Sequence, residues 1–244
     1  MSDRFDEITP RRQDAKTPSR TRIKICGLRD VATALVAAEA GADFIGLNFV
    51  EASPRYVDPA VAREIASALP QRVTAVGLFC NHSIEHIAEV VEAVGFQTAQ
   101  LHGEETPAFA KQLHDLKILK ALPFDPATLA NPLDGWRTLG DQLTGLLIDT
   151  PPQPDATITG GSGHAFDWSR LAAFDRSGGF AGLPPYLLAG GLTPDNVGEA
   201  IRTTRPWGVD VSSGVESSRG VKDPSLIKAF FEAVREADAS LTMD

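Results

Sequence analysis

The chain has 244 residues, of which 43% are hydrophobic and 23% charged, with a formal net charge of −9 and a pI near 5.1. This acidic balance excludes a general nucleic-acid binder, because no excess of Lys and Arg is available to neutralise phosphates. No apolar run reaches the ~18 residues of a membrane span. The two cysteines exclude a disulfide scaffold and favour a reducing compartment, which we expect to be the cytoplasm.

The first 20 residues predict a disordered tail. They lack apolar periodicity, mix basic with acidic side chains, and contain no hydrophobic segment of a secretory signal. We expect residues 21–244 to form one domain.

From Thr21 onwards, strand-like and helix-like segments alternate. The apolar runs predict strands at 22–26, 43–49, 72–80, 96–102, 117–122, 144–149, 185–190 and 207–212. A capping residue followed by proline predicts helix starts at Asp58-Pro59, Thr106-Pro107, Asp125-Pro126, Thr193-Pro194 and Asp223-Pro224. The segment 125–143 is the least regular and predicts a broken helix. Eight strand–helix units in this length favour a closed (β/α)8 barrel of the α/β class over an open doubly wound sheet.

Chemically useful side chains follow the predicted strands. Active sites of such barrels lie at the carboxyl ends of the strands. Here those ends carry Cys26, Asn48, Asn81, His102, Asp149, Gly190-Gly191 and Ser212-Ser213-Gly214. We predict that these groups converge on one rim of the barrel.

Strand alternation predicts which side chains share the inward face. Residues i and i+2 point to the same side, so Lys24 lies below Cys26, and Asp210 lies below Ser212. A closed barrel puts strand eight beside strand one, which predicts a buried ion pair between Lys24 and Asp210. Gln100 and His102 share the inward face of strand four in the same way.

Cys26 and Asp149 are the candidates for acid–base chemistry. A thiol at a strand end is either filler or a reactive group. The cation of Lys24 beneath it favours the thiolate, unless Asp210 neutralises that charge. Asp149 follows three aliphatic residues, so a raised pKa and a general-acid role are expected. The alternative for Asp149 is a structural carboxylate that binds loop amides.

Anion binding is expected in three loops. Gly190-Gly191 and Ser212-Ser213-Gly214 follow strands seven and eight, where barrels commonly hold a phosphate. The alternative for the glycine pair is a tight turn. Arg55 follows strand two and has a guanidinium that can clamp a carboxylate or phosphate, although a lone arginine is more often simply solvated.

Three further patterns carry less weight. His82-Ser83-Ile84-Glu85-His86 matches a zinc-protease pattern, but it starts directly after strand three, and capping or solvent roles are favoured. Cys80 is interpreted as a small buried hydrophobe. Gly160-Gly161-Ser162-Gly163 lacks a dinucleotide fingerprint and is interpreted as a mobile lid. From these patterns we predict no metal site.

Taken in order, the motifs resemble one family. They are Lys24-Ile25-Cys26-Gly27, Gly46-Leu47-Asn48-Phe49 with Ser53-Pro54-Arg55-Tyr56, Gln100-Leu101-His102-Gly103-Glu104, Leu147-Ile148-Asp149-Thr150, Gly190-Gly191-Leu192 and Asp210-Val211-Ser212-Ser213-Gly214-Val215-Glu216. Over about residues 21–237 the chain resembles phosphoribosylanthranilate isomerase of tryptophan biosynthesis. The resemblance implies a cofactor-independent barrel that carries out an Amadori rearrangement of N-(5-phosphoribosyl)anthranilate.

The resemblance also implies roles for single residues. Cys26 matches the general base, Asp149 the general acid, and Arg55 the arginine that holds the anthranilate carboxylate. The implied phosphate-binding residues are Gly190, Gly191, Ser212, Ser213 and Gly214. The implied substrate-binding residues of the pocket are His102, Asp210, Asn48 and Gln100. His164 departs from the family, because a lysine often follows the glycine-rich loop.

The expected partner is a small phosphorylated substrate, without nucleic acid or membrane, and the chain is expected to be a monomer or homodimer. One rival is a related phosphosugar isomerase with dual tryptophan- and histidine-pathway activity. Enzymes of the histidine pathway use an aspartate at the end of strand one, where this chain has Cys26. A non-catalytic phosphate-binding barrel is the second rival, and it gives no reason for a thiol and a carboxylate at one mouth.

Overall fold

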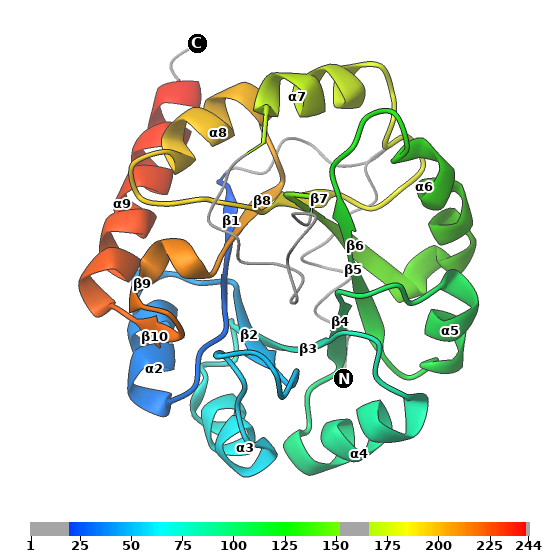
Figure 1. The fold of residues 1–244 in the computed structure, drawn as a ribbon. Helices are drawn as coiled ribbons and strands as arrows, with labels where there is room; N and C mark the ends of the chain where they lie inside the picture. Colours follow the sequence, from blue (N-terminus) through cyan, green and yellow to red (C-terminus); the bar gives the residue numbers. More distant parts are fainter. Residues whose placement is uncertain (1–19, 152–165, 243–244) are drawn as a thin grey trace.

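The computed structural model describes residues 20–151 and 166–242, and it confirms the predicted (β/α)8 barrel. Eight parallel strands close in the order β1 to β8, with an outer ring of helices (Figure 1). The strands are β1 (Arg22–Cys26), β2 (Phe44–Asn48), β3 (Thr74–Phe79), β4 (Thr98–Leu101), β5 (Lys117–Pro123), β6 (Leu143–Asp149), β7 (Tyr186–Leu188) and β8 (Gly208–Val211).

The helices follow the strands in turn. They are α2 (Val31–Ala40), α3 (Pro59–Ala68), α4 (Ile84–Val94), α5 (Pro107–Gln112), α6 (Ala130–Trp136), α7 (Trp168–Arg176), α8 (Val197–Thr204) and α9 (Pro224–Leu241), with short 3-10 helices η1 (Arg137–Gln142) and η2 (Ser213–Val215). A small hairpin of β9 (Glu216–Ser218) and β10 (Val221–Lys222) precedes α9. None of the helices in the described ranges is long and apolar enough to cross a membrane.

Three of the five predicted helix starts are confirmed. Asp58, Thr106 and Asp223 each accept a hydrogen bond from a backbone N–H of the first helical turn. The other two predictions are wrong, because a separate turn intervenes before the helix. Asp125 accepts from the N–H of Ala127 in a turn ahead of α6, and α8 begins after Asn196 rather than at Thr193.

The predicted break within 125–143 is confirmed. α6 gives way to η1 at Arg137, and Gly140 inside η1 has φ 55° and ψ −128°, which is not helical. A residue with a side chain is strained at this backbone conformation, whereas glycine is not.

The barrel interior changes from apolar to polar along the strands. Phe44, Val76, Leu119, Leu187 and Trp207 form a buried cluster inside the barrel. Ala121, Leu147 and Ala189 form a second buried cluster. Ala121 and Ala189 each lie two residues beyond a member of the first cluster, Leu119 and Leu187, and therefore on the same face. The polar groups at the carboxyl ends of the strands lie beyond this second cluster. The apolar layer therefore supports a polar mouth at one end only.

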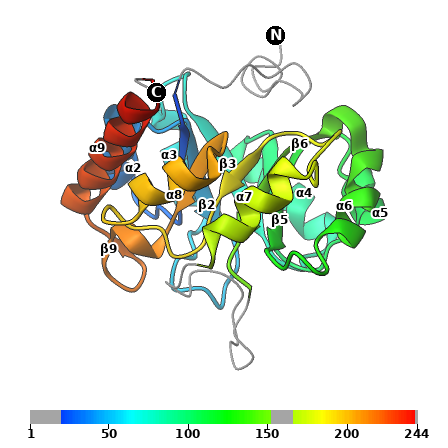
Figure 2. The same ribbon diagram turned by 90° about the horizontal axis from the view of Figure 1, so that it is seen from above.

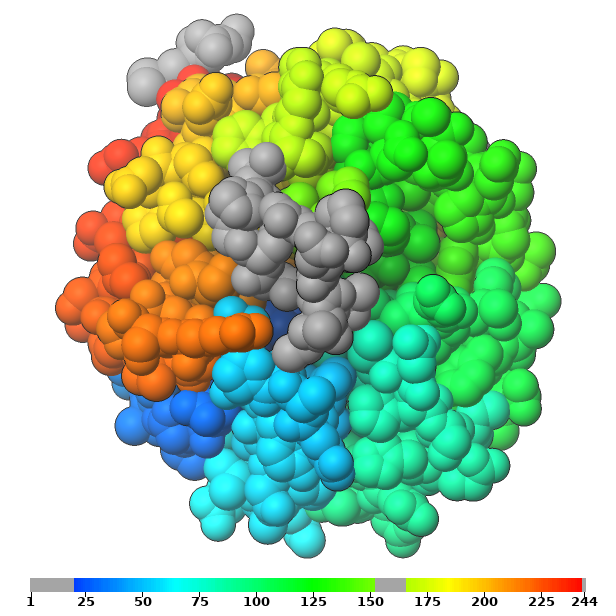
Figure 3. Space-filling model, viewed as in Figure 1, coloured from blue at the N-terminus to red at the C-terminus, as the bar shows by residue number. Residues whose placement is uncertain are grey.

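The two ends of the described chain meet where the barrel closes. β1 pairs with β8, with Lys24 opposite Asp210. Thr21 donates from its N–H and its hydroxyl to Asp238 of α9, at 2.9 and 2.6 Å. In the view from above, β9 lies at the end of the barrel opposite the C-terminal end of α9 (Figure 2). The surface of the mouth shows dark-blue atoms from the start of the described chain in a recess between the cyan and orange segments (Figure 3).

The predicted tail is only partly described. Residues 1–19 lie outside the described residues, as do Gly160-Gly161-Ser162-Gly163 and His164 of the predicted lid. Arg20 donates two hydrogen bonds to the carboxylate of Asp43, at 3.0 and 2.6 Å. Arg20 therefore belongs to the folded domain rather than to the tail.

Candidate active site

Cys26 lies beside the predicted ion pair. Lys24 Nζ donates to Asp210 Oδ1 at 2.8 Å, and the Lys24 side chain is fully buried, which confirms the pairing expected from alternation. Gly46 on β2 makes the room for this cluster. A Cβ at Gly46 would lie 2.9 Å from Cys26 Sγ and 3.1 Å from Lys24 Nζ, so only glycine leaves the thiol and the ammonium group in place.

Burial opposes ionisation of the thiol. It raises the pKa of Cys26, while Lys24 and, more weakly, Lys222 act in the opposite direction, and Asp210 adds to the rise. Burial also acts to lower the pKa of Lys24, but Asp210 and the thiolate outweigh it and the net pKa is raised. Lys24 therefore stays charged and favours the thiolate, as expected, but does not cancel the cost of desolvation.

Asp149 ends β6 and contacts His102. The distance from His102 Nε2 to Asp149 Oδ2 is 3.5 Å. Burial raises the pKa of Asp149 to about 6, although the N–H of Thr150, which donates to Oδ1 at 2.7 Å, acts to lower it. The carboxyl group of Asp149 thus has the features of both predicted roles. It binds a loop amide, as a structural carboxylate would, and its raised pKa suits a general acid.

Gln100 lies inside the barrel below His102, on the inward face that strand alternation predicted. Its side chain is fully buried, and its Nε2 lies 2.9 Å from His102 Nδ1. Burial is the main cause that lowers the pKa of His102 to about 4. Gln100 therefore contacts the pocket through His102.

Arg55 lies directly over the turn that follows Cys26. A Cβ at Gly27 would meet the side-chain carbons of Arg55 at 2.8 to 3.2 Å, and Gly27 has φ 81°, so this position requires glycine twice over. Arg55 is buried rather than solvated, and it donates from Nε and Nη2 to Glu216 at 2.7 and 3.0 Å.

Glu216 and Lys222 were missed as site residues. Lys222 Nζ donates to Glu216 Oε1 at 2.7 Å and to Ser212 at the carbonyl oxygen and Oγ, at 2.9 and 3.2 Å. Ser212 Oγ in turn donates to the carbonyl of Cys26 at 3.1 Å. No periodicity marks these two residues, because they lie in the β9–β10 hairpin. The sequence signal for Glu216 was its place at the end of the motif that begins at Asp210, and the counter-charge that a buried Arg55 needs becomes evident only from the structure.

The two predicted phosphate loops touch one another and the acid. A Cβ at Gly214 would lie 1.8 Å from the carbonyl oxygen of Leu192, and one at Gly190 would lie 2.9 Å from Asp149 Oδ1. Within the described chain, no group accepts from the backbone N–H of Gly190, Gly191, Ser213 or Gly214. Four N–H groups thus remain available to an anion.

Two residues shape loops at the mouth. Asn48 donates to Ser53 Oγ at 3.2 Å and accepts from the N–H of Val50 at 2.8 Å, which holds the loop that carries Arg55. Its contact with substrate stays a prediction. Glu105, also missed, accepts from the N–H groups of Asn81 and Gly103 and from Lys120, and so fixes the loop after His102.

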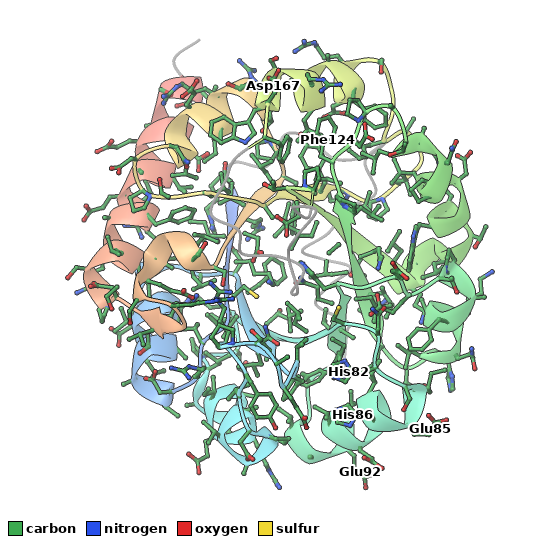
Figure 4. All side chains as sticks on the ribbon, viewed as in Figure 1. His82, Glu85, His86, Glu92, Phe124 and Asp167 are labelled. Atoms are coloured by element: carbon green, nitrogen blue, oxygen red, sulfur yellow. The ribbon has the colours of Figure 1, made fainter. Side chains whose placement is uncertain are left out.

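The zinc-protease pattern does not assemble. His82 precedes the capping residue Ser83, and its Nδ1 accepts from the N–H of Cys80. Figure 4 shows Glu85 projecting outward from α4, away from His82 and His86. Among the described residues no group of three or more His, Cys, Asp or Glu side chains is placed to hold a metal ion. Cys80 is partly exposed, so its interpretation as a small buried hydrophobe was wrong.

The fold and the site define a (β/α)8-barrel enzyme with an ionisable thiol, a protonatable carboxyl and an anion-binding rim at one mouth. The family profile of N-(5'-phosphoribosyl)anthranilate isomerase matches residues 23–233. The chain belongs to the N-(5'-phosphoribosyl)anthranilate isomerase family, as the resemblance predicted.

Individual relatives agree over nearly their whole length. The isomerase of Paracoccus denitrificans is 46% identical over 211 residues, which are 85% of this chain and 94% of that protein. The isomerase of Chlorobaculum parvum is 44% identical over 225 residues, 91% of this chain and 98% of that protein.

Solved structures match in the same way. The phosphoribosyl anthranilate isomerase of Thermotoga maritima superposes with a TM-score of 0.77 at 36% identity, over 88% of this chain and 99% of that one. A phosphoribosyl anthranilate isomerase in complex with reduced 1-(o-carboxyphenylamino)-1-deoxyribulose 5-phosphate matches with a TM-score of 0.74 at 33% identity, over the same shares of the two chains.

Proposed function

We propose that the protein converts N-(5'-phosphoribosyl)anthranilate to 1-(2-carboxyphenylamino)-1-deoxyribulose 5-phosphate in tryptophan biosynthesis. The observation that supports this most is the placement of Cys26 and Asp149. The two side chains end strands of one barrel, and the charges of Lys24 and Asp210 act on both. An aldose–ketose rearrangement needs one proton donor and one proton acceptor, and this pair supplies them without a cofactor.

Asp149 is the general acid in this proposal. Ring opening requires a proton at the furanose oxygen, and the reaction then leaves a Schiff base at C1′. A carboxyl group whose pKa is about 6 keeps far more of its proton near neutral pH than an ordinary aspartate does. Burial of its carboxyl group therefore prepares Asp149 as a donor.

Cys26 is the general base. The Schiff base acidifies the hydrogen at C2′, and the thiolate removes it to form the enol, which converts to the ketose. The thiol is buried and its pKa is raised, so the neutral thiol predominates in the free enzyme. The form with protonated Asp149 and ionised Cys26 is a minor one, and the two pKa values set the pH range in which it is present.

The anionic ends of the substrate find separate sites. Arg55 has its Nε and Nη2 bound to Glu216, and it offers the remaining edge of its guanidinium to the anthranilate carboxylate. Gly190, Gly191, Ser212, Ser213 and Gly214 hold the phosphate. Asp210, His102 and Asn48 line the pocket, with Gln100 behind them.

One assay tests the proposal. The unstable substrate is generated in situ from anthranilate and phosphoribosyl pyrophosphate, and loss of its fluorescence is followed after enzyme is added. A rate equal to that of the buffer control contradicts the proposed function.

Assembly and location extend the proposal. A crystal structure of a Thermotoga maritima relative is described as monomers of a dimeric enzyme, and we propose a monomer or homodimer here. Sedimentation of the purified protein decides between the two. Cys26 and Cys80 are not joined in a disulfide, which supports the cytoplasm as the compartment of the protein.

A further inference from the structure

An amide, an imidazole and a carboxyl form a row from the barrel interior to the mouth. Gln100 lies in β4, and His102 follows the end of that strand on the same face. Gln100 Nε2 lies 2.9 Å from His102 Nδ1. His102 Nε2 lies 3.5 Å from Asp149 Oδ2. This last distance is long for a hydrogen bond, as catalytic contacts in unliganded sites often are.

In this geometry the nitrogen of the Gln100 amide, rather than its oxygen, faces His102 Nδ1, and that placement favours one tautomer of the imidazole. An amide nitrogen donates and does not accept, so Nδ1 of His102 is the acceptor. A neutral imidazole has one proton, which must then be on Nε2, the atom that faces Asp149. Gln100 Oε1 is buried and has no hydrogen-bond partner among the described residues, so no other contact of the amide explains why Gln is at this position.

Burial, more than the charges around it, keeps His102 neutral. Burial lowers its pKa most. The charged groups that act on it are Asp210 and Glu105, which raise the pKa, and Lys24 and Lys120, which lower it, with the carboxyl of Asp149 in direct contact. A cationic His102 would draw the proton away from Asp149, because a positive charge at this distance favours the carboxylate.

We propose that Gln100 is a positioning residue for the acid: its amide donates to Nδ1 of His102 and keeps the imidazole proton on Nε2, directed at Asp149. The acid role of Asp149 rests on the proposed function, whereas the tautomer does not. When Asp149 gives up its proton, the Nε2–H group donates to the new carboxylate. His102 thereby stabilises the charge that develops during ring opening, without carrying a charge of its own.

Nitrogen NMR of the full chain labelled with 15N-histidine measures the tautomer directly. The resonances of His102 are assigned by comparison with His102→Asn. We expect a protonated Nε2 and an unprotonated Nδ1 at neutral pH. A protonated Nδ1 in the unmodified enzyme overturns the proposal, whatever the activity is.

Two variants test the functional part. Gln100→Met keeps the volume and loses the donor, and we expect kcat to fall roughly tenfold or more while KM stays within about threefold. Gln100→Glu places a carboxylate at Nδ1, so we expect His102 to titrate at least about one pH unit higher, because a nearby negative charge favours the imidazolium. Thr98→Ser, on the same face of β4, is the matched control.

The outcomes separate the two proposals. If Gln100→Met folds with an unchanged circular dichroism spectrum and keeps full kcat, the positioning role is wrong. If Gln100→Glu is too unstable to titrate, the positioning role of Gln100 is still tested by two measurements. These are the tautomer of His102 in the unmodified enzyme and the kcat of Gln100→Met. If the unmodified enzyme shows the Nε2–H tautomer but no isomerase turnover, the proposed function fails and the tautomer stands.

Discussion

Arg55 and Glu216, 161 positions apart in the chain, form a two-point ion pair through Nε and Nη2 at 2.7 and 3.0 Å. Lys222 Nζ donates to Oε1 of the same carboxylate, the oxygen that also accepts from Arg55 Nε. Burial acts to raise the pKa of Glu216, but the hydrogen bonds from Arg55 and Lys222 outweigh it and lower the pKa to about 2. The loop after β2 and the hairpin after β8 are thus held together by one carboxylate between two cations.

Replacing Glu216 by Gln is expected to weaken substrate binding more than turnover. The amide cannot accept from Arg55 and Lys222 as a carboxylate does, and two cations are left poorly paired in a buried site. We expect KM to rise roughly tenfold, and the free energy of unfolding to fall by about 3–5 kcal/mol, the usual cost of breaking a buried pair. Steady-state kinetics and urea unfolding measure the two effects.

The control for this variant is Ser218→Ala, an exposed position of the same strand β9. It should match the unmodified enzyme in both assays. A Glu216→Gln enzyme that keeps its KM would show that Arg55 does not need this carboxylate to bind substrate.

Replacing Cys26 by Ser is expected to abolish nearly all turnover and leave the fold intact. Serine fills almost the same volume, but its hydroxyl does not ionise near neutral pH. We expect kcat to fall by ~10²–10⁴, the usual contribution of a positioned base. The fluorescence assay measures the loss, and Cys80→Ser, which changes the other thiol, is expected to stay active. Substantial activity in Cys26→Ser removes the base assignment.

The pH dependence of kcat/KM is expected to have a limb near pH 6. Below about pH 6 both Asp149 and Cys26 are protonated, and no thiolate is present. Loss of one proton from the pair gives access to the active form, so kcat/KM rises with pH and then levels off. The value of kcat/KM falls again when the pair loses its second proton. This fall is expected above pH 8.5, the approximate pKa of an ordinary thiol, because burial raises the pKa of Cys26.

Asp149→Asn is expected to remove the limb near pH 6. The asparagine has no proton to lose, so the residual kcat/KM should rise continuously with pH until the thiol ionises. Turnover should fall by ~10²–10⁴, with a smaller effect on binding. If only substrate affinity falls, or if the limb near pH 6 persists in this variant, Asp149 is not the acid.

Lys24→Met is expected to make the thiol of Cys26 harder to ionise. Lys24 lowers the pKa of Cys26, so its removal should move the midpoint of alkylation by iodoacetamide to higher pH. Cys80→Ser is the parent for this experiment, since it leaves one reactive thiol. Lys228→Met, on the exposed side of α9, is the matched control. An unchanged midpoint would show that the ammonium group does not tune the thiol.

Strand periodicity predicted much of this site because a parallel barrel is a regular object. Alternation placed Lys24 opposite Asp210, and closure of the barrel made the pairing unavoidable. The same rule placed Gln100 below His102. Neither result required knowledge of the loops.

Loop geometry and desolvation were less accessible. The cation at Lys24 was expected to favour the thiolate, but burial of Cys26, which depends on the whole surrounding fold, has the larger effect. The contact of Arg55 with Glu216 joins two irregular segments, for which no period exists. The wrong helix starts at Asp125 and Thr193 have a related cause, since a cap and proline mark a turn as well as a helix.

The pairing of β1 with β8 has a consequence for how the enzyme comes into being. Lys24 is among the first residues of the barrel to be synthesised, and its partner Asp210 follows 186 residues later. Until the last strand arrives, the ammonium group has no counter-charge, and the thiol above it lacks the wall of its pocket. A growing or truncated chain that lacks β8 therefore cannot form the Lys24–Asp210 pair, and this cluster is complete only when the ring of strands closes.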